Sequence, residues 1–254
     1  MCILAGLPNE SSTDILKITR IDCMRYNWLI EVRTMAEKYQ LRSQIYRLRK
    51  ELRLWRTAKV PHLTLVYDFA PKVNAYKIAQ IVQKTARRYK KLEFNYTGWD
   101  LKRGPGGYVF GFKIEPSREL REFRYSLYHD LRPYILENQH QTENFNIKST
   151  DDFWFHASIA YHLDWNTGER INKFIRSNSG EDKQETKSIF NILNIFRSGQ
   201  HSAVTPYASE AEVTRIPILR SGRITYEYDF VLDRILNRKE ALSRRFFEMD
   251  RQTM

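Results

Sequence analysis

The sequence has few of the residues that several specialised protein classes require. Only two of its 254 residues are cysteines, Cys2 and Cys23, which is too few for a disulfide framework and favours a reducing compartment. Its ten glycines and eight prolines exclude collagen-like and low-complexity chains. No stretch approaches the roughly 18 consecutive apolar residues of a membrane span, and the first residues lack the basic segment of a secretory signal. We therefore expect a soluble cytoplasmic protein with no membrane partner.

The motifs that hold common cofactors are missing as well. The sequence contains no glycine-rich phosphate loop of either nucleotide-binding type, which argues against an ATP-driven kinase or a dehydrogenase. No cysteines and histidines lie at zinc-ligand spacing, and the acidic pair Asp151-Asp152 fits a turn better than a metal site. We predict that the protein uses no cofactor and no metal ion.

Positive charge and aromatic side chains are abundant. Lys and Arg outnumber Asp and Glu by 42 to 30, which gives a formal net charge of +12. Such a charge favours polyanionic partners, because Lys and Arg release counterions from a phosphate backbone. Hydrophobic residues make up 42% of the chain, enough for a sizeable core, and the many Tyr and Trp side chains can stack on unpaired bases. The composition therefore indicates binding of nucleic acid or nucleotides.

Hydrophobic periodicity divides the chain into strands and helices. Strands are predicted at 26–32, 60–69, 92–101, 108–114, 153–162, 211–219 and 223–232. Helices are predicted at about 35–55, 74–91, 117–136, 167–176 and 238–250, the third of them with Ser117 as its N-cap. A strand–helix–strand pattern occurs twice, each time ending in a strand that contains a histidine. We expect an α+β fold of two lobes with antiparallel pairing rather than a doubly wound parallel sheet.

Two short motifs share one pattern. His-Leu-Thr-Leu at residues 62–65 and His-Ala-Ser-Ile at residues 156–159 both alternate a histidine and a hydroxyl with apolar residues. Because side chains alternate along a strand, His62 and Thr64 project to one face of their strand, and His156 and Ser158 do the same on theirs. If the two strands are neighbours, two imidazoles and two hydroxyls form one polar cup.

These side-chain types suit phosphoryl chemistry. Imidazole titrates near neutral pH, so one histidine can accept a proton from an attacking water or hydroxyl while the other protonates the leaving oxygen. Hydroxyl groups can hold the non-bridging phosphate oxygens and offset the charge that builds in the transition state. A single histidine in a strand is more often structural, and it is the matched pair that predicts a catalytic site.

The two motifs resemble the signature of the 2H phosphoesterase superfamily, in particular its 2'-5' RNA ligase-like, RNA 2',3'-cyclic phosphodiesterase branch. The resemblance extends from about Tyr26 to Leu232. It implies a bilobal, pseudo-twofold fold in which antiparallel sheets line a central cleft and helices lie outside. It also implies that His62 and His156 are the catalytic pair and that Thr64 and Ser158 bind phosphate.

The activity that the resemblance implies is metal-independent hydrolysis of a 2',3'-cyclic phosphate, on RNA ends or nucleotides, to a 2'-phosphate. His62 would be the acid at the 3'-oxygen and His156 the base toward water. The reverse reaction, 2'-5' RNA ligation, would exchange these roles. Alternatives are a 3'-end-trimming or 2'-5' oligonucleotide phosphodiesterase, and a non-catalytic RNA-binding module of the same fold. The expected partner is RNA or a nucleotide with a cyclic phosphate, and a monomer is expected.

Three segments lie outside the smaller core that the resemblance implies. Residues 1–25 are interpreted as an N-terminal extension, residues 179–210 as an insertion in a phosphoesterase domain spanning 26–232, and residues 233–254 as a basic C-terminal helix. These segments are candidates for selecting the substrate.

Further substrate contacts are predicted from basic and aromatic residues. Many members of the family carry an arginine three residues after the second-motif hydroxyl, where this chain has Tyr161, so the resemblance does not imply that cationic contact for this chain. Arg56 shortly precedes the first motif strand and is a candidate for the mouth of the cleft. Candidates for stacking on bases are Tyr67, Tyr161, Tyr226 and Trp99. We interpret the other histidines as residues of the surface or a strand edge: His129, His140, His162 and His201.

Overall fold

A computed structural model of the chain describes residues 28–32, 38–54, 62–67, 74–104, 106–135, 153–179 and 209–243. The strands in these residues are β1 (Trp28–Val32), β2 (Leu63–Tyr67), β3 (Glu93–Gly104), β4 (Gly107–Pro116), β5 (His156–Leu163), β6 (Ser209–Glu212), β7 (Arg215–Arg220), β8 (Arg223–Asp229) and β9 (Arg234–Asn237). The helices are α2 (Lys38–Glu51), α3 (Ala75–Ala86), α4 (Arg118–Leu131), the 3₁₀ turn η1 (Arg132–Tyr134), α5 (Trp165–Ser179) and α6 (Arg238–Ala241).

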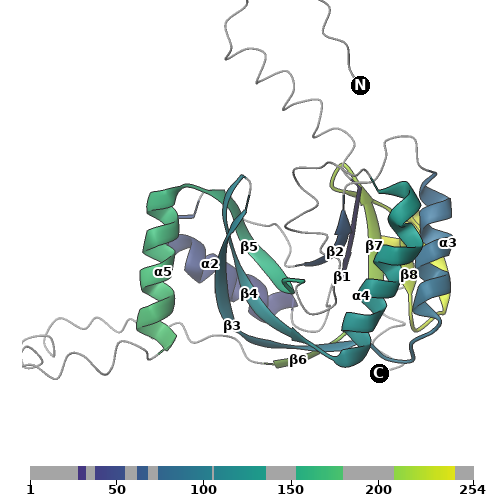
Figure 1. The fold of residues 1–254 in the computed structure, drawn as a ribbon, viewed down its shortest axis with the longest axis horizontal. Helices are drawn as coiled ribbons and strands as arrows, with labels where there is room; N and C mark the ends of the chain where they lie inside the picture. The colour runs from purple at the N-terminus through teal and green to yellow at the C-terminus, as the bar shows by residue number, and fades with distance from the viewer. Residues whose placement is uncertain are drawn as a thin grey trace, which may run out of the picture.

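The strands form one strongly curved sheet in the order β6-β3-β4-β5-β2-β1-β7-β8-β9, and every neighbouring pair is antiparallel. Figure 1 shows α3 and α4 against the outside of the half that contains β2, β1, β7 and β8, and α5 against the outside of the half that contains β3, β4 and β5. The predicted α+β architecture with antiparallel pairing is therefore confirmed. The centre of the sheet is the junction of β5 and β2.

Helix boundaries follow from local capping chemistry. The Ser117 hydroxyl accepts a hydrogen bond from the Leu120 N–H at 3.2 Å, so the predicted N-cap of α4 is confirmed. The helix ends at Leu131 rather than at residue 136 as predicted, because Pro133 has no N–H to continue the α-helical ladder, and the chain makes a 3₁₀ turn instead. The helix predicted at 167–176 is longer, since α5 spans Trp165–Ser179.

The strand predicted at 211–219 is in fact two strands in different halves of the sheet. β6 pairs with β3 at one edge, whereas β7 pairs with β1 and β8 in the other half. The chain leaves β6 at Val213, whose N–H donates to the Leu92 carbonyl at 2.8 Å. β6 alternates, with Ala211 buried between the exposed Glu210 and Glu212, whereas β7 is buried from Arg215 to Leu219. This pattern does not show which strands the two segments pair with.

The sheet continues beyond residue 232, the predicted end of the phosphoesterase domain. β9 pairs with β8, and α6 begins at once with a capping box between Asn237 and Glu240. Of the basic helix predicted at 238–250, the structure describes only the single turn Arg238–Ala241, and residues after 243 lie outside the described part. The predicted extension at 1–25 and nearly all of the predicted insertion at 179–210 lie outside it too.

The core lies between the sheet and its helices. In β2, Leu63 and Leu65 are buried, and in β5 the buried residues include Ala157 and Ile159. These are the apolar positions of the two motifs, so the predicted alternation is confirmed and the motif side chains face away from this packing. Among the helices of the described residues, none is long and apolar enough to cross a membrane.

Candidate active site

The two motif strands are direct neighbours. β2 and β5 are antiparallel, and Leu63 is the partner of Ala157. Because antiparallel partners share a face and adjacent residues alternate, the residues flanking this pair lie together on the opposite face. The register therefore sets His62 beside Ser158 and Thr64 beside His156, each histidine across from the hydroxyl residue of the other motif. The condition on which the predicted polar cup depends, that the two motif strands are neighbours, is confirmed.

His156 is held in one orientation by Trp154, which lies two residues before it. Its Nδ1 lies 2.9 Å from the Trp154 carbonyl oxygen. A carbonyl can only accept, so Nδ1 carries the hydrogen and donates it, which leaves the lone pair of a neutral imidazole on Nε2. The Trp154 ring stacks on the imidazole with 3.7 Å between ring centroids and 12° between planes. His156 is therefore fixed both by a hydrogen bond and by a flat aromatic contact.

The surroundings of His156 favour its neutral form. The pKa of His156 is lowered from 6.5 to about 4, mainly by burial; the hydrogen bond to Trp154 opposes the shift, and the charge of His62 adds to it. Smaller influences are Asp100, which raises the pKa, and Lys102, which lowers it. At neutral pH, His156 is an unprotonated imidazole that can accept a proton.

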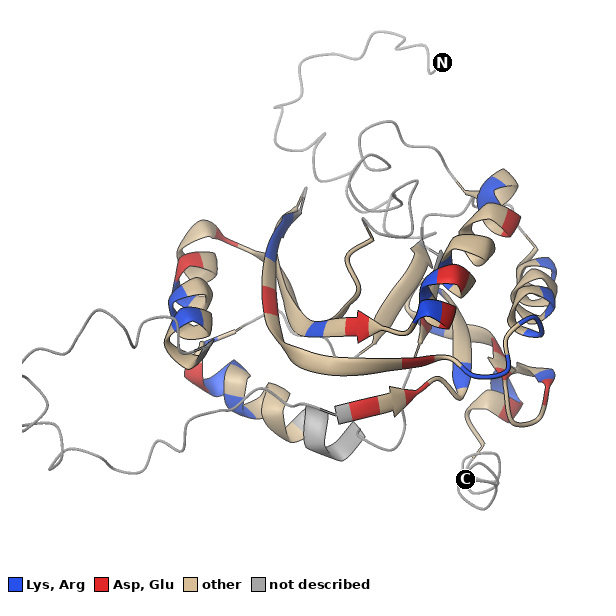
Figure 2. Ribbon diagram, turned by 60° about the horizontal axis from the view of Figure 1, so that its bottom comes forward, with Lys and Arg blue, Asp and Glu red and all other residues tan. Residues whose placement is uncertain are grey.

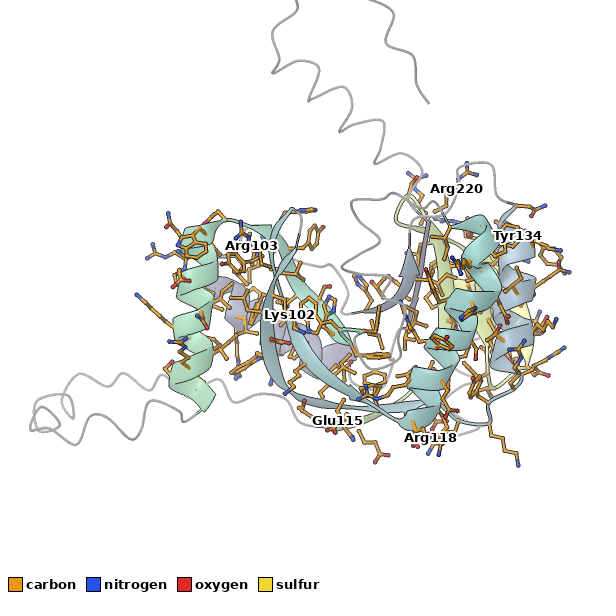
Figure 3. The ribbon with its side chains drawn as sticks, in the orientation of Figure 1. Lys102, Arg103, Glu115, Arg118, Tyr134 and Arg220 are labelled. Carbon is orange, nitrogen blue, oxygen red and sulfur yellow. The ribbon has the colours of Figure 1, made fainter. Side chains whose placement is uncertain are left out.

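Trp154 is itself anchored to the neighbouring strand. Its indole Nε1–H donates to Asp100 Oδ2 at 2.7 Å, and Lys102 Nζ lies 5.1 Å from the centre of its ring. Lys102, labelled in Figure 3, and Asp100 both belong to β3. Further along this face, Lys113 of β4 is the cross-strand partner of His156. The β3–β4 hairpin thus brings two cations and one carboxylate to the side of the second motif.

His62 has an acidic partner in β1. Its Nε2 lies 3.7 Å from Glu31 Oε2, and the Glu31 side chain is only 2% exposed while that of His62 is 22% exposed. Glu31 is the register partner of Thr64, so the carboxylate comes from the strand directly beside the first motif. A carboxylate at this distance forms an ion pair with His62 when the imidazole is protonated. The two histidines therefore have opposite surroundings.

A buried ion cluster links β7 and β8 in the half of the sheet that contains β1 and β2. Arg215 Nη1 donates to Glu227 Oε1 at 3.0 Å, and Arg215 Nε lies 3.1 Å from Asp229 Oδ2. All three side chains are at most 5% exposed. Arg215 therefore lies between two buried carboxylates.

The structure brings together only some of the predicted substrate contacts. Tyr226 packs against Tyr76 of α3, with ring centroids 5.6 Å apart, so it lies on the helix-covered face and not with the motif side chains. Trp99 is 8% exposed and packs against Phe174 in the core. Both assignments are corrected, because the helices that cover these faces could not be placed from strand periodicity alone. Tyr161 is 42% exposed and contacts His162 edge to face.

Other predicted residues lie outside the described part or are occupied elsewhere. Arg56 and the side chain of Tyr67 are outside it. His162 Nδ1 lies 3.2 Å from the Gly106 carbonyl at the end of the β4–β5 pair, and His129 contacts the Tyr125 hydroxyl at 3.0 Å. The residues that the structure describes contain no group of three or more His, Cys, Asp or Glu side chains arranged to hold a metal ion.

Sequence reasoning missed three neighbours of the motif histidines. Trp154 stands two residues before His156, where alternation alone would have placed it on the same face. Glu31 is the only charged residue of the predicted strand 26–32. A carboxylate inside an apolar strand signals a buried partner. Asp100 gave no such signal, because its contact with Trp154 depends on how the β3–β4 hairpin meets β5.

Comparison with known proteins gives a matching family and similar solved structures, among them two structures of one protein. The model of a family described as the 2'-5' RNA ligase superfamily matches residues 38–186. The structure of Kluyveromyces marxianus Usb1 with uridine monophosphate is 10% identical, with a TM-score of 0.42, and the match covers 79% of this chain and 97% of that one. A second structure of the same Usb1 is 9% identical, with a TM-score of 0.43 and coverages of 80% and 97%. No curated protein matches the chain.

Proposed function

The chain belongs to the 2'-5' RNA ligase superfamily, and on that premise we propose that it is a phosphodiesterase that opens 2',3'-cyclic phosphates with a pair of histidines. The observation that carries the proposal is the antiparallel partnership of Leu63 and Ala157. Through it, both histidine–hydroxyl motifs lie on one face at the centre of the sheet. The substrate is RNA ending in a cyclic phosphate, or a nucleotide with one.

The different surroundings of the two histidines assign their roles. His156 is neutral at physiological pH because burial lowers its pKa to about 4, so it is the general base that takes a proton from the attacking water. His62 Nε2 lies 3.7 Å from a carboxylate oxygen of Glu31, and in the proposal His62 is the general acid. These roles agree with the assignment that the family resemblance implies.

In the proposed reaction, His156 removes a proton from water and the water oxygen attacks phosphorus. The bond from phosphorus to the 3'-oxygen breaks, and the 3'-oxygen takes a proton from His62. The products are a 2'-phosphate and a free 3'-hydroxyl. The hydroxyls of Thr64 and Ser158 donate to the non-bridging oxygens while negative charge builds on them. Ligation is the same path in reverse, with the two histidines exchanging roles.

The groups that the reaction needs are all side chains of the two motifs, so we propose that it proceeds without a metal ion. The experiment is a panel of three substrates incubated with the protein in EDTA: a nucleoside 2',3'-cyclic phosphate, an RNA ending in one, and the same RNA ending in a 3'-hydroxyl. Turnover of either cyclic substrate to a 2'-phosphate is the expected result.

The same panel separates the alternatives. Shortening of the RNA with a 3'-hydroxyl end, without opening of either cyclic phosphate, would replace the proposal with a 3'-end-trimming phosphodiesterase. Binding of RNA with no turnover of any substrate would indicate a non-catalytic RNA-binding module.

A further inference from the structure

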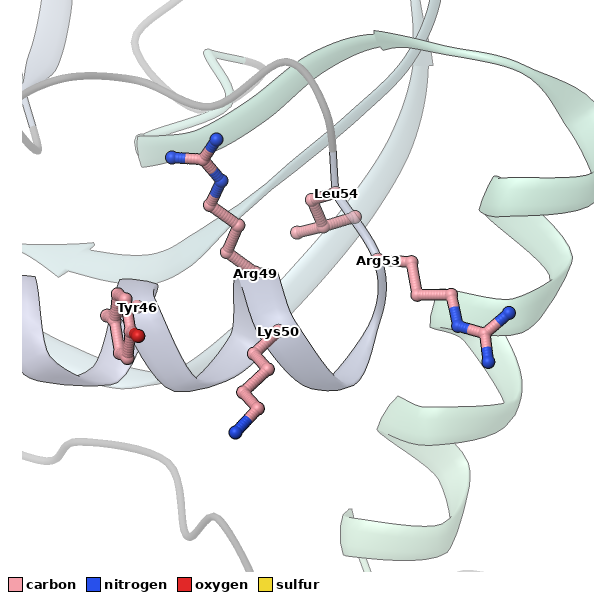
Figure 4. Close-up of a pocket in the computed structure, with 5 residues that line it drawn as sticks. All are labelled: Tyr46, Arg49, Lys50, Arg53 and Leu54. Carbon is pink, nitrogen blue, oxygen red and sulfur yellow. The ribbon is translucent and has the colours of Figure 1, made fainter.

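A basic pocket lies at the C-terminal end of α2, formed by residues outside the two motifs. It has a volume of about 460 Å³ and is lined by Tyr46, Arg49, Lys50, Arg53 and Leu54 (Figure 4). This volume falls in the range of small-ligand pockets, about 300–1,000 Å³. Nothing in the proposed reaction uses these residues, so the pocket requires its own explanation.

The pocket combines uncompensated positive charge with an aromatic side chain. Among the residues that the structure describes, none of its three cations forms an ion pair with a carboxylate. Tyr46 is 69% exposed, whereas Leu54 is 2% exposed and forms an apolar floor. Figure 4 shows the side chains of Arg49 and Arg53 extending on either side of Leu54. Cations around an apolar floor with an exposed ring are typical of sites for single-stranded nucleic acid.

Arg53 occupies a position at which glycine is the usual residue. The Leu54 N–H donates to the Arg49 carbonyl at 3.0 Å, and Arg53 between them has φ of 48°. This is the geometry of a Schellman motif, whose left-handed residue is usually glycine because a Cβ is disfavoured there. Arg170 of α5 donates to the Leu52 carbonyl at 3.1 Å and holds the turn in place. A guanidinium is therefore fixed at the pocket at a conformational cost.

A simpler explanation is that the cations stabilise the end of the helix. Basic side chains in the last turn interact favourably with the helix dipole, and Arg49 and Lys50 lie in that turn of α2. This explanation does not account for Arg53, since glycine would close the helix with less strain. It does not account for the exposed ring of Tyr46 either. A ligand that needs both positive charge and a stacking surface explains all of these features.

We propose that this pocket binds a nucleotide of single-stranded RNA outside the reacting end, with its phosphates on Arg49, Lys50 and Arg53 and its base on Tyr46. The proposal rests on the proposed function, because it makes the pocket the place where the body of the substrate is held. It predicts that RNA binds more tightly than a mononucleotide that fills the motif site alone.

The test compares two variants with the same change of charge. The pocket variant is Arg49→Gln/Lys50→Gln/Arg53→Asn, in which asparagine tolerates the left-handed conformation. The control is Lys77→Gln/Lys84→Gln/Lys90→Gln, which removes three exposed cations on or just after α3. Figure 2 shows Lys and Arg residues on the helices of both halves of the molecule. Fluorescence anisotropy with a short 2'-O-methyl RNA, which cannot be cleaved through its 2'-oxygens, measures the Kd of each protein over a range of salt concentrations.

The pocket variant is expected to bind this RNA about 10-fold more weakly than the control does. Its plot of log Kd against log salt concentration should be shallower by about 2, since each phosphate contact with a single strand contributes about 0.7 to the slope. Tyr46→Ala should weaken binding about 10-fold with no change in slope, because stacking carries no charge. Equal Kd and slope in the pocket and control variants would overturn the proposal.

Two further measurements keep this test separate from that of the proposed function. Arg53→Gly is expected to raise the thermal midpoint and to weaken RNA binding, and unchanged binding in this variant would count against the pocket. The kcat/KM for a nucleoside 2',3'-cyclic phosphate should be the same in the pocket variant and the wild type, because the proposed reaction uses none of the pocket residues. If the wild type turns over neither this substrate nor an RNA ending in a cyclic phosphate, the proposed function fails while the anisotropy experiment still decides on the pocket.

Discussion

Trp154 and His156 lie face to face, with 3.7 Å between their ring centroids and 12° between their planes. The same tryptophan supplies the carbonyl that accepts the Nδ1–H of His156, and its indole N–H is tied to Asp100. Trp154 therefore controls both the orientation of the proposed base and its exclusion from water. We interpret it as a positioning residue for His156.

Replacing Trp154 tests this role. Trp154→Ala should lower kcat by about 10-fold, because the imidazole loses the surface that orients it. It should also raise the pKa of His156, because water then reaches the ring. The acidic limb of the plot of kcat/KM against pH should therefore shift from about pH 4 to a higher pH. Trp154→Phe keeps the stacking and should keep most of the activity. A lower rate with an unmoved acidic limb would contradict the positioning role.

The lowered pKa of His156 also makes stability depend on pH. In the unfolded chain this histidine binds a proton below about pH 6.5, whereas in the folded protein it does so only below about pH 4. Because the unfolded state binds more protons in this window, the free energy of unfolding should fall as the pH falls from 6.5 to 4, by about 3 kcal/mol. Urea unfolding at several pH values measures it. His156→Asn should flatten this part of the curve, and an equally steep curve in that variant would refute the assignment.

The buried Arg215 cluster should be essential for stability. Arg215→Met leaves Glu227 and Asp229 buried without their cation, which should cost about 3–5 kcal/mol of unfolding free energy. The triple variant Arg215→Met/Glu227→Gln/Asp229→Asn removes the charges together and should recover much of that loss. Chemical denaturation compares them, with Arg118→Met in the exposed pair with Glu122 as a control expected to show no measurable change. A small effect of Arg215→Met would mean that the cluster is not a charge-paired unit.

Gly111 of β4 lies close to the second motif. It is the register partner of Ser158, and a Cβ placed on it would lie 2.7 Å from the Ala157 carbonyl oxygen and 3.4 Å from His156 Cδ2. Gly111→Ala should therefore displace β5, with a loss of about 1–3 kcal/mol of stability and a lower kcat.

The control for Gly111 is Gly222 in the β7–β8 turn. It has φ of +71°, and a Cβ there meets nothing within 4 Å. Gly222→Ala should cost about 1 kcal/mol through backbone strain and leave kcat unchanged. Full activity in Gly111→Ala would show that its contact with β5 does not position the motif.

The sequence was sufficient to predict the centre of the molecule. Alternation of His62 and Thr64 with buried leucines identified the exposed face of one motif, and the same pattern identified the other. Family membership, expected from the two motifs, is confirmed by the match to residues 38–186. These features are encoded within a few consecutive residues, so local pattern recognition captures them.

The features that could not be predicted depend on contacts between distant segments. The partner of His62 is Glu31, which reaches it only because β1 lies beside β2 in the sheet. Tyr226 was expected near the substrate, but α3 covers the face of β8 on which it lies. The strand expected at 211–219 divides because its two parts find partners at β3 and β1. The order of the strands in the sheet and the placement of the helices decide these outcomes. Hydrophobic periodicity carries no information about either.

The central claim, that His62 and His156 act as an acid and base pair, is tested most directly by single-turnover hydrolysis of a nucleoside 2',3'-cyclic phosphate in EDTA. We predict that His62→Ala and His156→Ala each lower the rate about 10²–10⁴-fold. Thr64→Val and Ser158→Ala should cost less, about 10- to 10³-fold, as a lost donor to the phosphate does. Near-full turnover by either histidine variant, with its fold intact by circular dichroism, would contradict the account.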